Sequence, residues 1–134
     1  MNHEPHQTIF PVVSYRDPRS ALAFLAAAFG FTEEEVAEHD GQVVHAQMSC
    51  AGSMIMVSGI RTGDSVFDIT PSCVYVVVED VDAHRDRAAA AGAEIVMEPT
   101  DQDYGSRDYA ARDPEGNVWA FGTYQPAPAG AARS

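Results

Sequence analysis

A few side chains in this sequence could act as acids, bases or nucleophiles. His45 is the strongest candidate, because an imidazole titrates near neutral pH and can both accept and donate a proton. Tyr109 could serve as its partner in acid–base chemistry. A structural role for His45, hydrogen-bonded to Gln47 or to the backbone, is the competing interpretation. Two cysteines, Cys50 and Cys73, have neither the number nor the spacing of a disulfide framework or a zinc site, and we expect them to be small buried residues.

The remaining histidines are weaker candidates for chemistry. His84 falls on the charged face of a predicted helix, where we expect it to be solvated. His3, His6 and His39 are expected in a terminal segment or a turn.

Composition excludes several classes of function. The 134 residues fit one domain, and 20 carboxylates against eight arginines, with no lysine, give a net charge of −12 that would repel nucleic acid. Such a surface attracts cationic ligands or simply keeps the protein in solution. The apolar stretch 21–29 is far shorter than the roughly 20 residues of a membrane helix, and the polar N-terminus lacks a signal pattern, so we expect a cytoplasmic protein.

These side chains must be positioned by an internal repeat with a period of about 63 residues. An apolar run that ends at Asp17 precedes an alanine-rich segment that ends at Gly30, and the same order recurs up to Asp80 and Gly92. Each Asp can cap a helix and each Gly suits a helix end. Alternation and helical spacing predict helices over 20–29 and 81–91, and strands over 9–15, 33–39, 42–48, 54–58, 93–97, 108–112 and 117–123.

Three motifs and their order resemble the vicinal oxygen chelate superfamily, which includes glyoxalases, bleomycin resistance proteins and extradiol dioxygenases. They are Val-Glu-Asp-Val-Asp at 78–82, Tyr-Gly-Ser-Arg at 104–107 and Asp-Pro-Glu-Gly-Asn-Val-Trp at 113–119. The resemblance implies an α+β fold in which two βαβββ modules, 8–59 and 72–124, form a curled mixed sheet around a cavity. Residues 60–71 would be the linker and 125–134 a flexible tail. It also implies a homodimer.

The resemblance further implies where a divalent metal would be held in the metal-dependent members. The equivalent positions carry Phe10, Met56, Cys73 and Ala120. Three of these side chains cannot donate to a metal ion, and a single cysteine cannot hold one. We therefore expect no metal and no other cofactor, which argues against metal-assisted glyoxalase or dioxygenase chemistry.

Strand alternation predicts the lining of the implied cavity, because opposite residues in a hairpin share a face. If Arg112 opposes Asn117, Tyr109 lies opposite Ala120, and by the same count Gln47 opposes Met54 and His45 opposes Met56. A shift of one residue would turn Trp119 inward instead. By resemblance, Tyr104 and Arg107 overhang the pocket. The predicted ligand-binding residues are Phe10, His45, Gln47, Met54, Met56, Tyr75, Tyr104, Arg107, Tyr109 and Trp119.

This lining is apolar and aromatic with a few polar groups, as small-molecule sites are. It favours a metal-free binding protein for a small aromatic or cationic molecule, and antibiotic sequestration would be one such role. An enzyme of the same superfamily, with a non-standard metal site or with His45 and Tyr109 as acid and base, is the alternative. A structural partner of a larger assembly also remains open, because the segment 21–29 is apolar nearly all round.

Overall fold

The computed structural model describes residues 7–60 and 62–127. Within this part of the chain two modules follow the order βαβββ. The first contains β1 (Val12–Tyr15), α1 (Pro18–Phe29), β2 (Thr32–His39), β3 (Gln42–Cys50) and β4 (Ser53–Gly59). The second contains β5 (Cys73–Val77), α2 (Val81–Ala90), β6 (Glu94–Asp101), β7 (Arg107–Arg112) and β8 (Val118–Gly122). Residues 128–134 of the expected tail, together with His3 and His6, lie outside the described residues.

Each module forms a four-stranded mixed sheet, in the orders β1-β4-β3-β2 and β5-β8-β7-β6 across the described residues. The first strand of each module runs parallel to the last, and the other neighbours are antiparallel. The predicted α+β class and the paired βαβββ modules are confirmed. The two sheets do not join into one closed sheet, because among the described residues β1 and β5 each have a strand neighbour on one side only.

Both helices begin at the predicted aspartates. The Asp17 carboxylate accepts hydrogen bonds from the Ser20 amide and hydroxyl, and Pro18 occupies the first turn of α1, where its missing N–H costs nothing. Asp80 caps α2 by accepting from the Ala83 amide. Gly30 ends α1 with φ 77°, a conformation that glycine adopts at little cost.

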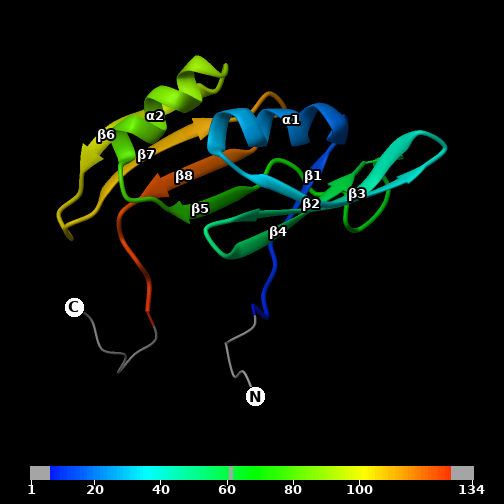
Figure 1. Cartoon of the computed structure of the whole chain (residues 1–134), viewed down its shortest axis with the longest axis horizontal. Coiled ribbons are helices and arrows are strands. Elements are labelled where there is room, and N and C mark those ends of the chain that lie inside the picture. The colour runs from blue at the N-terminus through cyan, green and yellow to red at the C-terminus, as the bar shows by residue number, and fades with distance from the viewer. Residues whose placement is uncertain (1–6, 61, 128–134) are drawn as a thin grey trace.

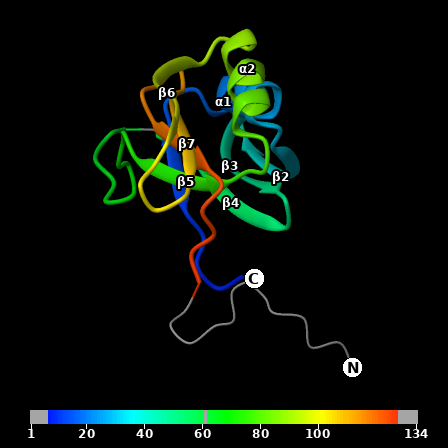
Figure 2. The ribbon, with the colours of Figure 1, turned by 90° about the vertical axis from the view of Figure 1, so that its left-hand side faces the viewer.

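The two helices lie side by side on the same side of the sheets (Figures 1 and 2). Alternate strand residues therefore face the helices, and we call this the helix-covered face; it carries, among others, Val13, Tyr15, Met48, Val57, Trp119 and Phe121, all of which are buried. The residues between them form the open face. Among the described residues, none of the helices is both long and apolar enough to cross a membrane.

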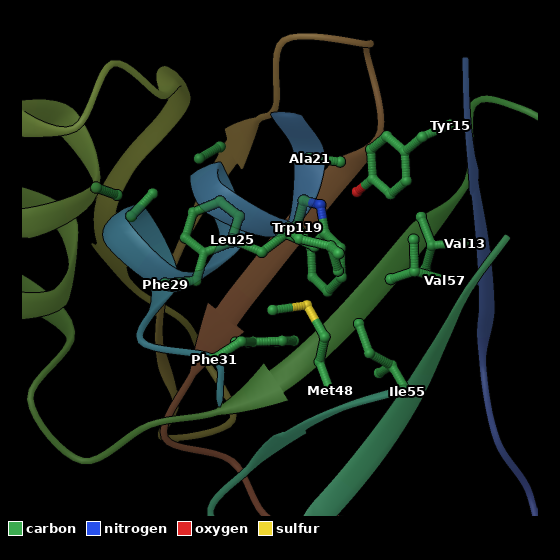
Figure 3. Close-up of a cluster of buried hydrophobic side chains, with 14 of the residues drawn as sticks. Val13, Tyr15, Ala21, Leu25, Phe29, Phe31, Met48, Ile55, Val57 and Trp119 are labelled. Carbon is green, nitrogen blue, oxygen red and sulfur yellow. The ribbon is translucent and has the colours of Figure 1, made fainter. Parts of the chain in front are cut away.

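One hydrophobic core spans both modules. Figure 3 shows Trp119 from β8 among side chains from α1, β1 and β4 of the other module. Its ring lies 5.6 Å from the Phe29 ring and 5.4 Å from the Phe31 ring, measured between centroids. The modules are thus held together by packed aromatic side chains, and no main-chain ladder between β1 and β5 is seen among the described residues.

The environment of His84 corrects the sequence interpretation. The imidazole is half-buried rather than solvated, stacked against Phe29 and packed on Phe121 with ring centroids 4.2 Å apart. Its Nδ1 lies 2.5 Å from the Tyr109 hydroxyl, and burial lowers the pKa of His84. The prediction failed because the helix contains few apolar residues, so its buried side could not be recognised from periodicity.

Candidate functional site

The open face of the first module carries four of the predicted ligand-binding residues. Gln47 opposes Met56, and His45 opposes Ser58. The predicted pairs, Gln47 with Met54 and His45 with Met56, were wrong by two residues because β3 and β4 are joined by a two-residue turn that pairs Cys50 with Ser53. A shift of two preserves the face, so His45, Gln47, Met54 and Met56 remain together.

His45 is half-buried in the middle of β3, and its Nε2 atom has no hydrogen-bond partner among the described residues. The predicted partner for acid–base chemistry is not near it. Tyr109 belongs to the other sheet and to the opposite, helix-covered face, where it is fully buried. Burial raises the pKa of the Tyr109 hydroxyl.

The predicted register of the second hairpin was wrong by one residue. Arg112 opposes Val118, so Tyr109 opposes Phe121 and Ala110 opposes Ala120. The turn is tighter than predicted because the Asp113 carboxylate binds the amides of Glu115 and Asn117 and pairs Asp113 with Asn117. Tyr109 and Trp119 consequently lie in the core, whereas Ala110, Ala120 and Gly122 lie on the open face.

A cleft of about 540 Å³ lies between the modules. Its walls are the segment that precedes β1, the β3–β4 hairpin, and β5 with the residues that follow it; mostly apolar side chains line it, among them Ile9, Pro11, Met54, Tyr75 and Val77. The Gln7 side chain holds the first wall in place, because its amide both donates to and accepts from the backbone of Met54, at 2.8 and 2.7 Å.

Only two of the predicted ligand-binding residues, Met54 and Tyr75, line this cleft. His45, Gln47 and Met56 share the open face with Met54 but do not line the cleft. Phe10 precedes β1 and is 39% exposed. The cleft runs along the edge of β5 that has no strand neighbour among the described residues, so main-chain groups as well as side chains border it.

The loop between β6 and β7 carries Tyr104, and Arg107 is the first residue of β7; both were predicted to overhang the pocket. The Arg107 guanidinium lies 2.9 Å from Asp82 and 3.1 Å from Asp101, which raises the pKa of Arg107 and fixes the side chain on the outer surface. Tyr104 instead donates a hydrogen bond of 3.0 Å to Asp108. Sequence reasoning missed Asp108, which is only 9% exposed.

The hairpin at 113–117 does more than turn the chain. The buried Asp113 carboxylate accepts hydrogen bonds from the Tyr15 hydroxyl at 2.6 Å and from the Trp119 indole at 3.1 Å. Burial, together with the bond to Asp113, raises the pKa of Tyr15. Glu115 accepts from the amides of Arg16 and Asp17 at 2.7 and 2.8 Å. These contacts fasten the second module to the start of α1.

The superfamily's metal positions do not fit a metal ion in this chain. Met56 lies beside Val12 on the open face, and Ala120 lies beside Tyr75. A thioether and a methyl group cannot replace the carboxylate and imidazole donors that divalent metals require. Within residues 7–60 and 62–127, no three His, Cys, Asp or Glu side chains form a group that could hold a metal ion.

Comparison with known proteins agrees with this architecture. The family model described as Glyoxalase/Bleomycin resistance protein/Dioxygenase superfamily matches residues 8–121. An uncharacterised protein of Mycobacterium bovis is 31% identical over 131 residues, covering 91% of this chain and 85% of its own length.

Solved structures show the same fold. The crystal structure of TioX from Micromonospora sp. ML1 has a TM-score of 0.75 and 33% identity, and the match covers 91% of this chain and 99% of that one. A lactoylglutathione lyase from Agrobacterium tumefaciens shares the fold at 19% identity, with a TM-score of 0.66 and coverage of 89% and 95%. The chain belongs to the Glyoxalase/Bleomycin resistance protein/Dioxygenase superfamily.

Proposed function

We propose that this protein binds a small aromatic or cationic molecule in the cytoplasm without transforming it and without a metal cofactor, as a protein that sequesters an antibiotic would. The observation that carries the proposal is the apolar cleft of about 540 Å³ between the modules. This volume lies within the range of small-molecule sites, about 300–1,000 Å³. The side chains at the superfamily's metal positions support the same reading, because they offer apolar contact in place of metal donors.

Binding can be measured with N-phenyl-1-naphthylamine, a neutral aromatic dye that fluoresces when it leaves water. We expect saturable binding in the micromolar range, which corresponds to about 7–8 kcal/mol. Val77→Asp places a charge in the cleft and should weaken binding at least tenfold. Val96→Asp is the matched control, because Val96 is exposed to a similar degree, 40% against 36%, and lies on β6 away from the cleft.

The proposal fails if the wild-type protein shows no saturable binding up to about 100 μM dye, or if the two valine variants weaken binding equally. A panel of aromatic antibiotics, titrated by calorimetry, then narrows the ligand class. The product of each incubation should be unchanged by mass spectrometry.

We further propose that two copies of the chain associate. Apolar side chains are exposed on the segment between the modules and before β1: Val66 is 78% exposed, Phe67 70%, Ile69 68% and Ile9 84%. Such side chains are costly to leave in water and are typical of interfaces. Light scattering should give the mass of a dimer, and Phe67→Asp should shift it toward the monomer. A monomer at every concentration would contradict this part of the proposal.

An enzymatic function is the second candidate, and the unpartnered Nε2 atom of His45 favours it. A buried ring nitrogen without a partner is costly to maintain, and a substrate could supply the missing hydrogen bond. A turnover screen with superfamily substrates, with His45→Gln as the inactive variant, tests this. Elemental analysis of protein prepared without chelators tests for a metal held elsewhere.

A further inference from the structure

Three tyrosines and a buried carboxylate gather at one end of the second sheet. Tyr104 and Tyr124 stand at right angles, with ring centroids 5.7 Å apart and an interplanar angle of 86°. The Tyr75 hydroxyl donates a hydrogen bond of 2.7 Å to the backbone oxygen of Tyr124. Asp108 accepts from the Tyr104 hydroxyl at 3.0 Å and from the Ser106 hydroxyl at 2.5 Å. We call these four residues, Tyr75, Tyr104, Asp108 and Tyr124, the tyrosine cluster.

The fold makes room for this carboxylate through a glycine. Asp108 on β7 opposes Gly122 on β8, on the open face. A Cβ atom at position 122 would overlap the Asp108 carboxylate and would lie 2.7 Å from the Tyr75 hydroxyl. Any side chain at position 122 would therefore displace Asp108 or Tyr75, so the placement of these two residues requires glycine.

Among the described residues, the hydrogen bonds to the Asp108 side chain come from neutral hydroxyl groups. In the ranges that the structure describes, no arginine or histidine forms an ion pair with it. The neighbouring Arg107 is bound by Asp82 and Asp101 instead. This carboxylate is 9% exposed and accepts two hydrogen bonds from hydroxyl groups, so its hydrogen-bonding needs are met. Its charge still attracts a cation strongly, because the surrounding protein screens it poorly.

The tyrosine rings select the kind of cation. Aromatic faces attract alkylated ammonium groups, which are weakly hydrated and too large to be coordinated as a metal ion is. Tyr104 is 65% exposed and Tyr124 is 40% exposed, so the rings can be reached from solvent. The hydroxyl of Tyr104 donates to a carboxylate, which makes its ring more electron-rich and the attraction stronger.

We propose that the tyrosine cluster is a binding site for an organic ammonium group, and that it receives the cationic end of the ligand whose apolar part occupies the cleft. Tyr75 connects the two places, because it lines the cleft and its hydroxyl binds the backbone of Tyr124. Gln125, the next residue, also lines the cleft. The link to the cleft rests on the proposed function, whereas the ammonium site itself can be tested alone.

Choline and its neutral analogue 3,3-dimethyl-1-butanol have nearly the same shape and differ in charge. Nuclear magnetic resonance titration of the whole protein should show saturable shifts for choline at the amides of residues 104–108 and 122–125. The neutral analogue should bind roughly tenfold more weakly or not at all. Equal binding of the two probes, or shifts scattered over the acidic surface without saturation, would overturn the proposal.

Variants locate the site. Tyr104→Leu removes an exposed ring and should weaken choline binding about tenfold, while Tyr104→Phe, which keeps the ring and loses the hydrogen bond to Asp108, should weaken it less. Phe67→Leu is the matched control, since Phe67 is 70% exposed, lies outside the tyrosine cluster and remains apolar in the proposed dimer interface after the change. Asp108→Asn should also weaken choline binding. If Tyr104→Leu and Phe67→Leu behave alike, the cluster is not the site.

The naphthylamine dye separates this inference from the proposed function. Dye binding without choline binding retains the cleft and removes the ammonium site. Choline binding without dye binding retains the ammonium site and removes the cleft as the place for the rest of the ligand. Dye binding by Asp108→Asn also establishes that this variant is folded, so that a loss of choline binding reflects the charge.

Discussion

The two modules share one strand order but differ in what their sheets and helices carry. In the first, α1 buries Leu22, Leu25 and Phe29, and the open face carries methionines, His45 and Gln47. In the second, α2 buries little beyond Val81 and Ala88, yet β8 supplies Trp119 and Phe121 to the common core. Its open face has small residues beside a carboxylate and tyrosines. The repeated backbone therefore places equivalent positions alike, but the modules contribute different side chains. The first contributes an apolar helix, and the second contributes the aromatic residues of the common core and the polar residues that bind the first module.

The largest effect is expected from a comparison of equivalent positions on the last strand of each module, which tests whether the two modules contribute differently to the core. Trp119→Ala should lower the free energy of unfolding by about 3–5 kcal/mol, because the ring fills the space between α1 and both sheets. Ile55→Val, at the equivalent position of β4, should cost only about 0.5–1.5 kcal/mol. Urea denaturation measures both values. Similar losses would mean that the core does not depend on the second module in this way.

The hairpin aspartate provides the next test. Asp113→Asn should destabilise the protein by about 2–3 kcal/mol, since a buried carboxylate that accepts from Tyr15 and Trp119 loses charge-assisted hydrogen bonds. Tyr15→Phe, which removes one of those donors, should cost about 1 kcal/mol. The equivalent residue of the first module is Ser49, whose hydroxyl meets Glu34 at the surface, and Ser49→Ala should stay within about 0.5 kcal/mol. An Asp113→Asn effect as small as that of Ser49→Ala would contradict the anchoring role.

A smaller effect should appear in the pH dependence of stability. Burial lowers the pKa of His84 in the folded state below its ordinary value of about 6.5, so the unfolded chain binds the proton more readily as the pH falls. The contribution of neutral His84 to the free energy of unfolding should therefore be fully present above about pH 6.5. It should decrease below that pH, by at most about 1.4 kcal/mol per pH unit. His84→Asn should flatten this part of the profile. Tyr109→Phe should keep the slope, because the imidazole stays buried.

The smallest effect concerns surface ion pairs. Arg107 binds two carboxylates, Asp82 and Asp101, whereas in the described part of the chain Arg19 of the first module forms an ion pair with one, Glu38. Arg107→Gln should lower the melting temperature slightly more than Arg19→Gln, and the difference should disappear in 1 M NaCl because salt screens exposed charges. A difference that survives high salt would show that Arg107 acts through packing.

Sequence reasoning was strongest where a local signal fixes the backbone. The duplication, both helix starts and the strand order follow from Asp17, Asp80 and the spacing of apolar runs, because capping and alternation are local effects. Register was weaker, since a turn that shifts by one residue moves Tyr109 from one face to the other, and that shift depends on side-chain hydrogen bonds of Asp113. The tyrosine cluster could not be foreseen, because Tyr75, Asp108 and Tyr124 meet only after the strands pair. Its trace in the sequence is Gly122, a glycine at the end of a strand that carries Trp119 and Phe121.

The dependence of the first module on Trp119 has a consequence for synthesis on the ribosome. Residues up to Gly59 leave the ribosome with Phe29 and Phe31 lacking the ring that covers them, and the 60 residues that follow take roughly 3–12 s to be added at about 5–20 residues per second. Until then the apolar side chains of the first module that Trp119 will cover stay exposed on the nascent chain. The common core is therefore completed only when the second module has been made, and a chain that stalls before Trp119 keeps apolar side chains exposed, which favours aggregation.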